Sequence, residues 1–244
     1  RYSVLSAVGL FPLELLGIDT ESLCVGARDM RDSCLNPDNP ERDSEAHNIA
    51  MISASVLFEH YKNKINIHDI FVFSPNFFAL GQWYRQLVGE SLGKQFNNSG
   101  EEVFVGFAPT VSVGSTDLHS VAQLYLGGPY DKFTTFVSVE KHNISDINVP
   151  DFKELNKLVP EIKNKTVGNV LEAIFSGTCQ AYKNSKRPYV SIIFSEASEY
   201  YLGQFLQFKM LEVIYLAKLL EINPFDQPQV ELYKIETRNC LTSI

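Results

Sequence analysis

Gln86 and Glu90 are the residues whose types and spacing best suit proton transfer. They lie four residues apart in a segment with helical periodicity, so both side chains fall on one face of a helix and can point into one cleft. A carboxylate in a cleft can take a proton from a substrate and return it. The same pair is also typical of a solvated helix face, and spacing alone does not separate the two interpretations.

A second segment, residues 109–120, combines glycine with small hydroxyl residues after a run that is predicted as a strand. Ser115 or Thr116 can cap a helix there, and the free N–H groups at such a helix start attract an anion. His119 then falls in the first turn, where the helix dipole disfavours the imidazolium and leaves a neutral imidazole that can exchange protons. A lone histidine at such a place is more commonly a packing or surface residue. The other histidines have polar neighbours and are predicted to lie at the surface: His47, His60, His68 and His142.

The residues next to Lys234 and Arg1 in the sequence do not show what the charges of these two side chains do. Lys234 falls about two turns into a final helix that we expect to begin near Pro228, with Asp226 as its N-cap. Lysines on such helices usually face solvent. Arg1 opens an apolar-rich run without an initiator methionine, so we expect further sequence to precede it.

Four short apolar runs alternate with longer helical patterns. Each run is apolar on both faces and therefore needs cover on both sides, which favours a mainly parallel sheet between two helix layers. The predicted fold is a Rossmann-like, three-layer α/β/α sandwich. Strands are expected at residues 70–73, 103–107, 133–139 and 189–194. Helices are expected at residues 45–63, 75–92, 166–182 and 200–222.

Two polar segments interrupt this alternation. Residues 34–44 are predicted to form a loop, in which Asp43 or Ser44 caps the following helix. Residues 144–165 contain two prolines and mixed charges, and are predicted to form an irregular excursion from the sheet.

The composition narrows the class of function. The 244 residues include 21 Lys and Arg against 29 Asp and Glu, a net charge of −8, and no basic stripe, which argues against nucleic-acid binding. The four cysteines show neither a CxxC pair nor metal-ligand spacing, which favours a reducing, cytoplasmic setting and no metal site. Lys209 and Glu212 interrupt the most apolar segment, residues 200–222, so it is predicted to be a core helix and not a membrane span. No phosphate-binding glycine motif for a nucleotide cofactor is present.

Taken in chain order, four strings resemble the glucose-6-phosphate isomerase (phosphoglucose isomerase) family in its shorter bacterial form. They are RYSVLSAVGL at 1–10, QLVGES at 86–91, GSTDLHS at 114–120 and NPFDQPQVELYK at 223–234. The resemblance extends from the first residue to the last. It implies a fold of two sugar-isomerase (SIS) domains, of which residues 1–222 are the second and residues 223–244 a closing segment and helix. The first domain is expected upstream of residue 1.

The resemblance also implies an activity, namely the interconversion of glucose 6-phosphate and fructose 6-phosphate through a cis-enediol, without metal or cofactor. Glu90 matches the base that moves a proton between C1 and C2, and Gln86 matches a substrate-site residue. Arg1 matches an arginine beside the enediol, where a fixed charge stabilises an oxyanion. His119 and Lys234 match residues that open the sugar ring, and the histidine comes from the neighbouring subunit, which implies a homodimer.

The family's phosphate site, a Ser/Thr-rich loop of the first domain, has no counterpart in this sequence. We therefore expect a C-terminal portion of the isomerase with little or no activity by itself. A non-catalytic phosphosugar-binding module that regulates other proteins remains an alternative, as does a fold without any ligand.

Overall fold

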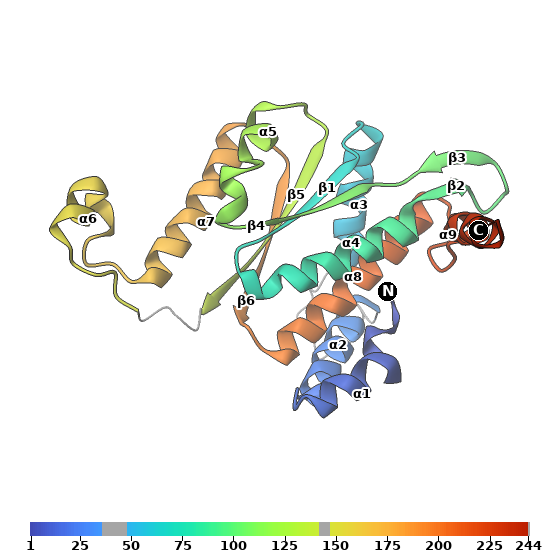
Figure 1. Cartoon of the computed structure of the whole chain (residues 1–244), viewed down its shortest axis with the longest axis horizontal. Coiled ribbons are helices and arrows are strands. Elements are labelled where there is room, and N and C mark those ends of the chain that lie inside the picture. Colours follow the sequence, from blue (N-terminus) through green and yellow to red (C-terminus); the bar gives the residue numbers. More distant parts are fainter. Residues whose placement is uncertain (36–47, 142–146, 244) are drawn as a thin grey trace.

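A parallel sheet of four strands forms the centre of the molecule (Figure 1). The computed structural model describes residues 1–35, 48–141 and 147–243. The strand order is β4-β1-β5-β6, and every neighbouring pair is parallel. The strands are β1 (Ile67–Val72), β4 (Ala108–Val113), β5 (Lys132–Lys141) and β6 (Tyr189–Glu196).

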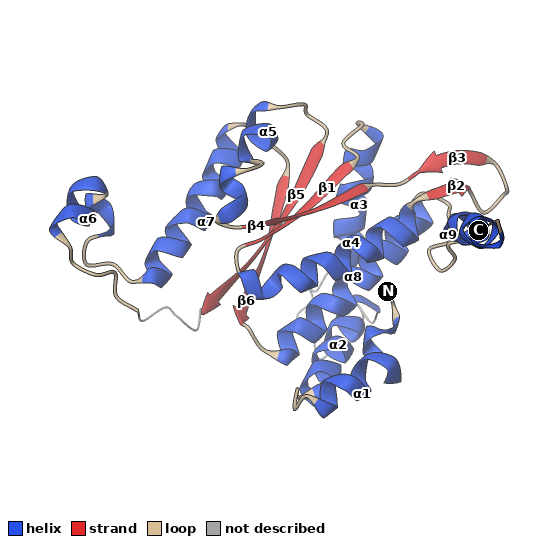
Figure 2. Ribbon diagram, in the orientation of Figure 1, coloured by secondary structure: helices blue, strands red, loops and turns tan. Residues whose placement is uncertain are grey.

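Helices cover both faces of this sheet, which confirms the predicted three-layer fold (Figure 2). Alternate residues of β1 face opposite layers: Ile70 and Val72 belong to one buried cluster, whereas Phe71 belongs to the other. The first layer contains α4 (Phe78–Leu92) and α8 (Glu199–Leu219), with α2 (Thr20–Leu35) and α3 (Ile49–Lys62) packed on α8. The second layer contains α5 (Ala122–Gly127) and α7 (Val167–Asn184).

Shorter elements surround the three layers. The chain begins with η1 (Ser3–Leu5) and α1 (Ala7–Leu15), and a 3-10 turn, η2 (Pro75–Phe77), leads into α4. A hairpin of β2 (Lys94–Phe96) and β3 (Glu102–Val105) follows α4, and η3 (Thr116–His119) follows β4. The remaining elements are α6 (Lys153–Leu158), η4 (Pro160–Ile162) and the last helix, α9 (Pro228–Thr242).

The prediction of a sheet strand at residues 103–107 is wrong in two respects, namely the strand with which this segment pairs and the residue at which it ends. Its first part is β3, which pairs antiparallel with β2 outside the central sheet, and the central strand begins only at Ala108. The chain turns at Gly106, whose φ of +145° is open to glycine but not to most residues. A Cβ at Gly106 would also lie 2.9 Å from the Cα of Gly93. The apolar run is therefore split between two sheets.

The predicted helices are present, with shifted starts. The first begins at Ile49 and not at residue 45, and the Asn48 side chain caps it by accepting a hydrogen bond from the Met51 N–H at 3.0 Å. Asp43 and Ser44 lie outside the described residues, and of the loop predicted at 34–44 only Cys34 and Leu35 are described, at the end of α2. Residues 75–92 start with the turn of η2.

Of the excursion predicted at residues 144–165, the described part, residues 147–165, carries α6 and η4, and in Figure 1 these two elements stand apart from the sheet.

The apolar segment predicted at residues 200–222 is a core helix, α8, and both Lys209 and Glu212 are completely buried in it. None of the helices in the described ranges combines the length and apolar character that a membrane span requires.

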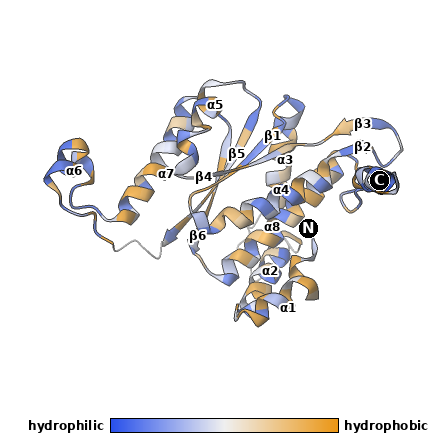
Figure 3. Cartoon of the chain, in the orientation of Figure 1, coloured by the Kyte–Doolittle hydropathy of each residue, from blue (hydrophilic) through white to orange (hydrophobic). Residues whose placement is uncertain are grey.

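Figure 3 shows the apolar residues of α1, of which Val8, Phe11 and Leu15 are about two-thirds or more exposed.

The prediction that the remaining histidines lie at the surface is wrong for His68, which is 2% exposed. Its Nε2 lies 2.8 Å from the Thr135 hydroxyl, and the ring of Tyr84 packs against it edge-on. Burial, reinforced by the charge of Lys209, lowers the pKa of His68 to about 3, so the ring is neutral. His60 is partly buried against a ring of the core, while His47 and His142 lie outside the described residues.

Candidate active site

The last two turns of α4 present the predicted carboxylate and amide. Leu87 and Val88 are buried against the core, which leaves Gln86 and Glu90 on the outer face. The Gln86 amide donates to Glu90 Oε1 at 3.1 Å, so the two side chains share one face as their spacing predicts. The Glu90 side chain is 34% exposed, and so it can still be reached from solvent.

Arg1 binds the other oxygen of this carboxylate. Its Nη1 donates to Glu90 Oε2 at 2.9 Å, and its Nε donates to the Ser91 hydroxyl at 2.9 Å. Nη1 also donates to the side-chain oxygen of Gln227. Because the arginine side chain is only 6% exposed, this ion pair is partly shielded from water and is stronger than a surface pair.

The remaining donors of Arg1 bind the main chain of the turn before α9. Nη2 donates to the carbonyl of Pro224 at 2.9 Å and to the carbonyl of Asp226 at 3.1 Å. The indole of Trp83 in turn donates to the Arg1 carbonyl at 3.0 Å and holds the arginine backbone against α4. All five N–H donors of the guanidinium therefore have acceptors within the protein.

Ser91, Lys94 and Gln227 are site residues that sequence reasoning did not single out. Ser91 and Gln227 lie inside two of the quoted strings, but no spacing rule connects a helix end with a turn more than 130 residues away. The predicted N-cap of α9, Asp226, is wrong, because Gln227 occupies that position. The Asp226 carboxylate instead lies 3.3 Å from Lys94 Nζ.

His119 is not brought to this cluster within the chain. It lies exposed in the last turn of η3, so the prediction of a capped first helical turn is wrong, and Ser115 makes no side-chain cap. Gly89 lies beside Pro109 at the start of β4, whereas η3 follows the other end of that strand. A six-residue strand separates the two places by roughly 17 Å.

Lys234 lies on α9, near the cluster but outside its hydrogen-bond network. Its Nζ donates to Glu231 at 2.6 Å, and this contact raises the pKa of Lys234. Glu231 and Gln227 both line a cavity of about 320 Å³ at the base of α9. Lys234 contacts the first of these residues and Arg1 contacts the second.

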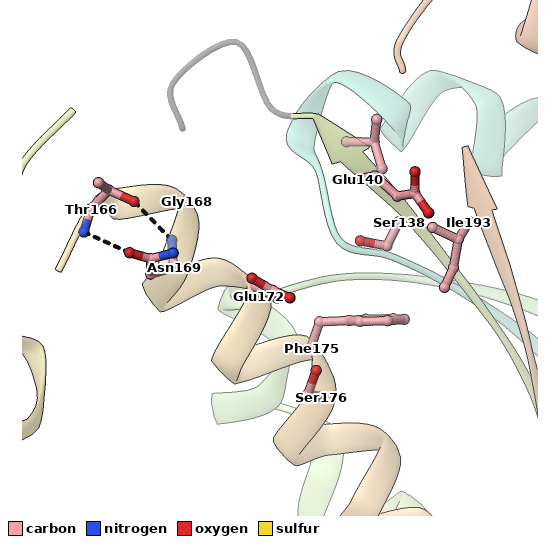
Figure 4. A pocket seen from close by; sticks show the side chains of 10 residues that line it. Ser138, Glu140, Thr166, Gly168, Asn169, Glu172, Phe175, Ser176 and Ile193 are labelled. Atoms are coloured by element: carbon pink, nitrogen blue, oxygen red, sulfur yellow. Dashed lines mark hydrogen bonds between the residues drawn. The ribbon is translucent and has the colours of Figure 1, made fainter. Parts of the chain in front are cut away.

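A second cavity, of about 680 Å³, lies at the carboxyl ends of β5 and β6 beside the start of α7 (Figure 4). Glu140 and Glu172 line it from a strand and a helix, and Thr166 and Asn169 exchange hydrogen bonds at its rim. Both carboxylates are exposed, and among the described residues that line the cavity none carries a positive charge. We place the candidate site at α4, because within residues 1–35, 48–141 and 147–243 only this place brings a carboxylate against a buried guanidinium.

Across the described ranges, no group of three or more His, Cys, Asp or Glu is placed to hold a metal ion. The chemistry that the α4 cluster supports is proton transfer by a carboxylate, with a fixed positive charge beside it.

Comparison with known proteins identifies the fold and the family of the chain. Solved structures with the same fold include the hypothetical protein TT0462 from Thermus thermophilus, with a TM-score of 0.85 and 30% identity over 97% of this chain and 54% of that one. A glucose-6-phosphate isomerase from Chlamydia trachomatis has a TM-score of 0.78 at 18% identity, covering 98% of this chain and 46% of that one. The layered fold is therefore one that a sugar-phosphate isomerase also has.

A family model described as phosphoglucose isomerase matches residues 1–243. The chain is 35% identical to the glucose-6-phosphate isomerase of Carboxydothermus hydrogenoformans, over 95% of the chain and 48% of that protein. It is 31% identical to that of Methanocaldococcus jannaschii, over 95% of the chain and 53% of that protein. The chain belongs to the phosphoglucose isomerase family, and it spans about half the length of these relatives.

Proposed function

We propose that this chain carries the proton-transfer part of a glucose-6-phosphate isomerase, which interconverts glucose 6-phosphate and fructose 6-phosphate in the cytoplasm, in glycolysis and gluconeogenesis. The observation that carries the proposal is the Glu90 carboxylate, held by Arg1 on one oxygen and by Gln86 on the other. A proton-transfer group needs a fixed direction and an accessible oxygen, and the 34% exposure of this side chain leaves it reachable.

In the proposed reaction Glu90 removes the proton from C2 of the open-chain aldose. The electrons of that C–H bond form the C1=C2 bond of a cis-enediol, while the carbonyl oxygen at C1 takes up a proton from water. Glu90 then returns its proton to C1, and the hydroxyl at C2 gives up its own proton to water as it becomes the carbonyl of the ketose.

Arg1 stabilises the negative charge that develops on the enediol oxygens. Since its five donors are already committed, one of them has to be released to the substrate. Gln227 is the partner that costs least to replace, because its neutral amide is exposed and can turn to water, whereas Glu90 is charged, Ser91 is buried and the other two acceptors are main-chain carbonyls. We therefore expect Gln227 to exchange its contact with Arg1 when substrate binds.

The ring-opening groups and the assembly complete the proposal. Lys234 donates to the ring oxygen from α9, and His119 acts on the site of a neighbouring subunit in a homodimer. Residues 1–222 form the second sugar-isomerase domain and residues 223–244 the closing segment, while the phosphate group of the substrate is bound by a preceding domain. The separation of His119 from Glu90 along β4 supports the shared site.

The test is Glu90→Gln in the full-length gene product, assayed with fructose 6-phosphate. A carboxamide cannot carry the proton, so we expect kcat to fall by about three orders of magnitude or more. Glu59→Gln is the matched control, because Glu59 forms an exposed ion pair with Lys62 on α3. Undiminished activity of Glu90→Gln contradicts the proposal, as does sugar-phosphate binding without turnover in the unmodified protein, which would favour a regulatory module.

A further inference from the structure

Lys94 is a buried cation beside the site to which the proposed function gives no role. Its side chain is only 4% exposed. Its Nζ donates to the carbonyl of Glu90 at 2.9 Å and to the carbonyl of Asp226 at 2.7 Å, and it lies 3.3 Å from the Asp226 carboxylate. An ammonium group has three N–H donors, so each donor of Lys94 has an acceptor.

These acceptors belong to two elements that are distant in sequence. The Glu90 carbonyl is one of the last four of α4, which have no partner within the helix and favour a cation. The Asp226 carbonyl belongs to the turn before α9, and it accepts from both Lys94 and Arg1. One carbonyl therefore bridges the two cations, and the turn is held against the end of α4 from two sides.

The burial of Lys94 is costly unless these contacts form. Burial lowers the pKa of Lys94, and the hydrogen bond with Asp226 opposes that effect. A lysine with only a solubilising role would keep its ammonium in water. The arrangement thus has the form of a fixed clamp.

The position of α9 depends on this turn, because α9 has no buried residues among those that the structure describes. Besides the two cations, the ring of Phe225 packs on that of Tyr2 at 5.3 Å between centroids. At the start of α9, the Gln229 amide also donates to the side-chain oxygen of Gln95 at 3.4 Å.

We infer that Lys94 is a positioning residue, which clamps the turn of residues 223–227 to the end of α4 and so sets Lys234 and Gln227 relative to the Glu90 carboxylate. The inference rests on the proposed function for its effect on turnover, but the clamp itself can be measured without activity. It acts through the main-chain carbonyls of Glu90 and Asp226 more than through the ion pair, since the Asp226 carboxylate is 51% exposed.

The test uses Lys94→Met, which keeps the aliphatic stem and removes the charge, in the full-length gene product. We expect kcat to fall by about 10- to 100-fold, with KM changed much less, because misplacement of catalytic groups by about 1 Å costs that much. In hydrogen exchange, the protection factors of the amides of residues 225–231 should fall about 10-fold, and those of the amides of β1 should not change. Lys132→Met is the matched control, because Lys132 is also a nearly buried lysine in an ion pair, with Asp131, but lies at the start of β5.

Two further variants keep the test decisive. Lys94→Gln retains an N–H donor for one carbonyl and should give intermediate losses even if Lys94→Met unfolds. Asp226→Ala removes the carboxylate but keeps the carbonyl, and we expect turnover to fall less than about threefold. Unchanged protection of residues 225–231 in both Lys94 variants overturns the inference. If instead Glu90→Gln keeps full activity, the proposed function fails, and the exchange data still decide whether Lys94 is a clamp.

Discussion

At the scale of single residues, Arg1 has an unusual number of roles for one side chain. Its guanidinium joins Ser91 and Glu90 on α4 with three acceptors in the turn before α9. Lysine has three donors on one nitrogen and cannot span these positions. We therefore expect Arg1→Lys to lower kcat/KM by about 100-fold or more in the full-length gene product.

The matched control for this substitution is Arg187→Lys. Arg187 also donates to three main-chain carbonyls, those of Leu126, Gly128 and Pro129, but on the opposite layer of the molecule. It should lower the midpoint of thermal unfolding and leave kcat/KM unchanged. Equal losses of activity in both variants would mean that Arg1 acts only through stability.

Asp69 supports a pH-dependent prediction. Its carboxyl is completely buried on β1, and Oδ1 accepts hydrogen bonds from Thr110, Ser112 and Tyr125. Oδ2 has no hydrogen-bond partner within the described part of the chain. Burial raises the pKa of Asp69 from 3.8 to about 6, so the fold favours the protonated acid.

Because the folded-state pKa is the higher one, this stabilisation is complete below pH 3.8 and is lost as the pH rises through about 6. The shift corresponds to ~3 kcal/mol. Asp69→Asn removes the titration, so the free energy of unfolding of the wild type, relative to this variant, should fall by that amount between pH 3.8 and about 7 in urea titrations. The control Asp32→Asn, which replaces a side chain that is 37% exposed, should show no such difference; a parallel pH profile for Asp69→Asn would contradict the assignment.

At the scale of residues, the sequence predicted only those contacts that form within one helix. Gln86 and Glu90 could be paired because helix periodicity alone puts them on one face. The burial of His68 and the contacts of Lys94 could not be predicted, because they depend on segments that are 67 or 132 residues away. Local polarity was a poor guide to His68, because the polar residue beside it, Asp69, is itself completely buried.

At the scale of elements, the buried ion pair of α8 is the feature with the clearest energetic consequence. Lys209 Nζ lies 3.0 and 2.9 Å from the two oxygens of Glu212, and both side chains are at most 1% exposed. Tyr84 on α4 also donates to Glu212 at 2.7 Å, so the pair connects the two helices of one layer. The Lys209 charge lowers the pKa of Glu212 despite its burial.

Removing one partner leaves the other charge unpaired, so Glu212→Gln should destabilise the fold by about 3–5 kcal/mol. The double variant Lys209→Met, Glu212→Gln should cost less than the sum of the two single changes, because no charge is then left without its partner. Chemical denaturation of the three proteins measures this coupling. Strict additivity would show that the two groups do not stabilise each other.

The strands could be predicted from the sequence where a whole apolar run belongs to a single sheet. The strands predicted at residues 133–139 and 189–194 both belong to the parallel sheet, the first as the inner strand β5 and the second as the edge strand β6. The run at residues 103–107 has the same composition, but the bend at Gly106 divides it between the hairpin and the strand that begins at Ala108. The composition of a segment predicts that it is extended, but tertiary packing decides with which strand it pairs.

At the scale of the whole molecule, the proposed catalytic groups fall at two ends of the chain's own sheet. Glu90, Gln86 and Arg1 gather near the start of β4, and His119 follows its other end, roughly 17 Å away by strand geometry. In Figure 1, α5, which follows His119, and α9 lie on opposite sides of the sheet. A single chain in this fold does not bring all these groups to one substrate, whereas a two-fold symmetric pair can.

This arrangement predicts complementation between inactive subunits. Full-length Glu90→Gln and His119→Ala subunits, co-expressed or unfolded and reassembled together, should recover about a quarter of wild-type activity, since half of the dimers are mixed and each has one complete site. The control pair is Glu90→Gln with Arg1→Lys, whose residues contact each other within one chain at 2.9 Å. Mixing these two leaves every site with one defect, so activity should stay at the level of the separate variants. If the His119→Ala mixture recovers nothing while its dimers form, His119 acts on no neighbouring site, and the shared-site proposal is wrong.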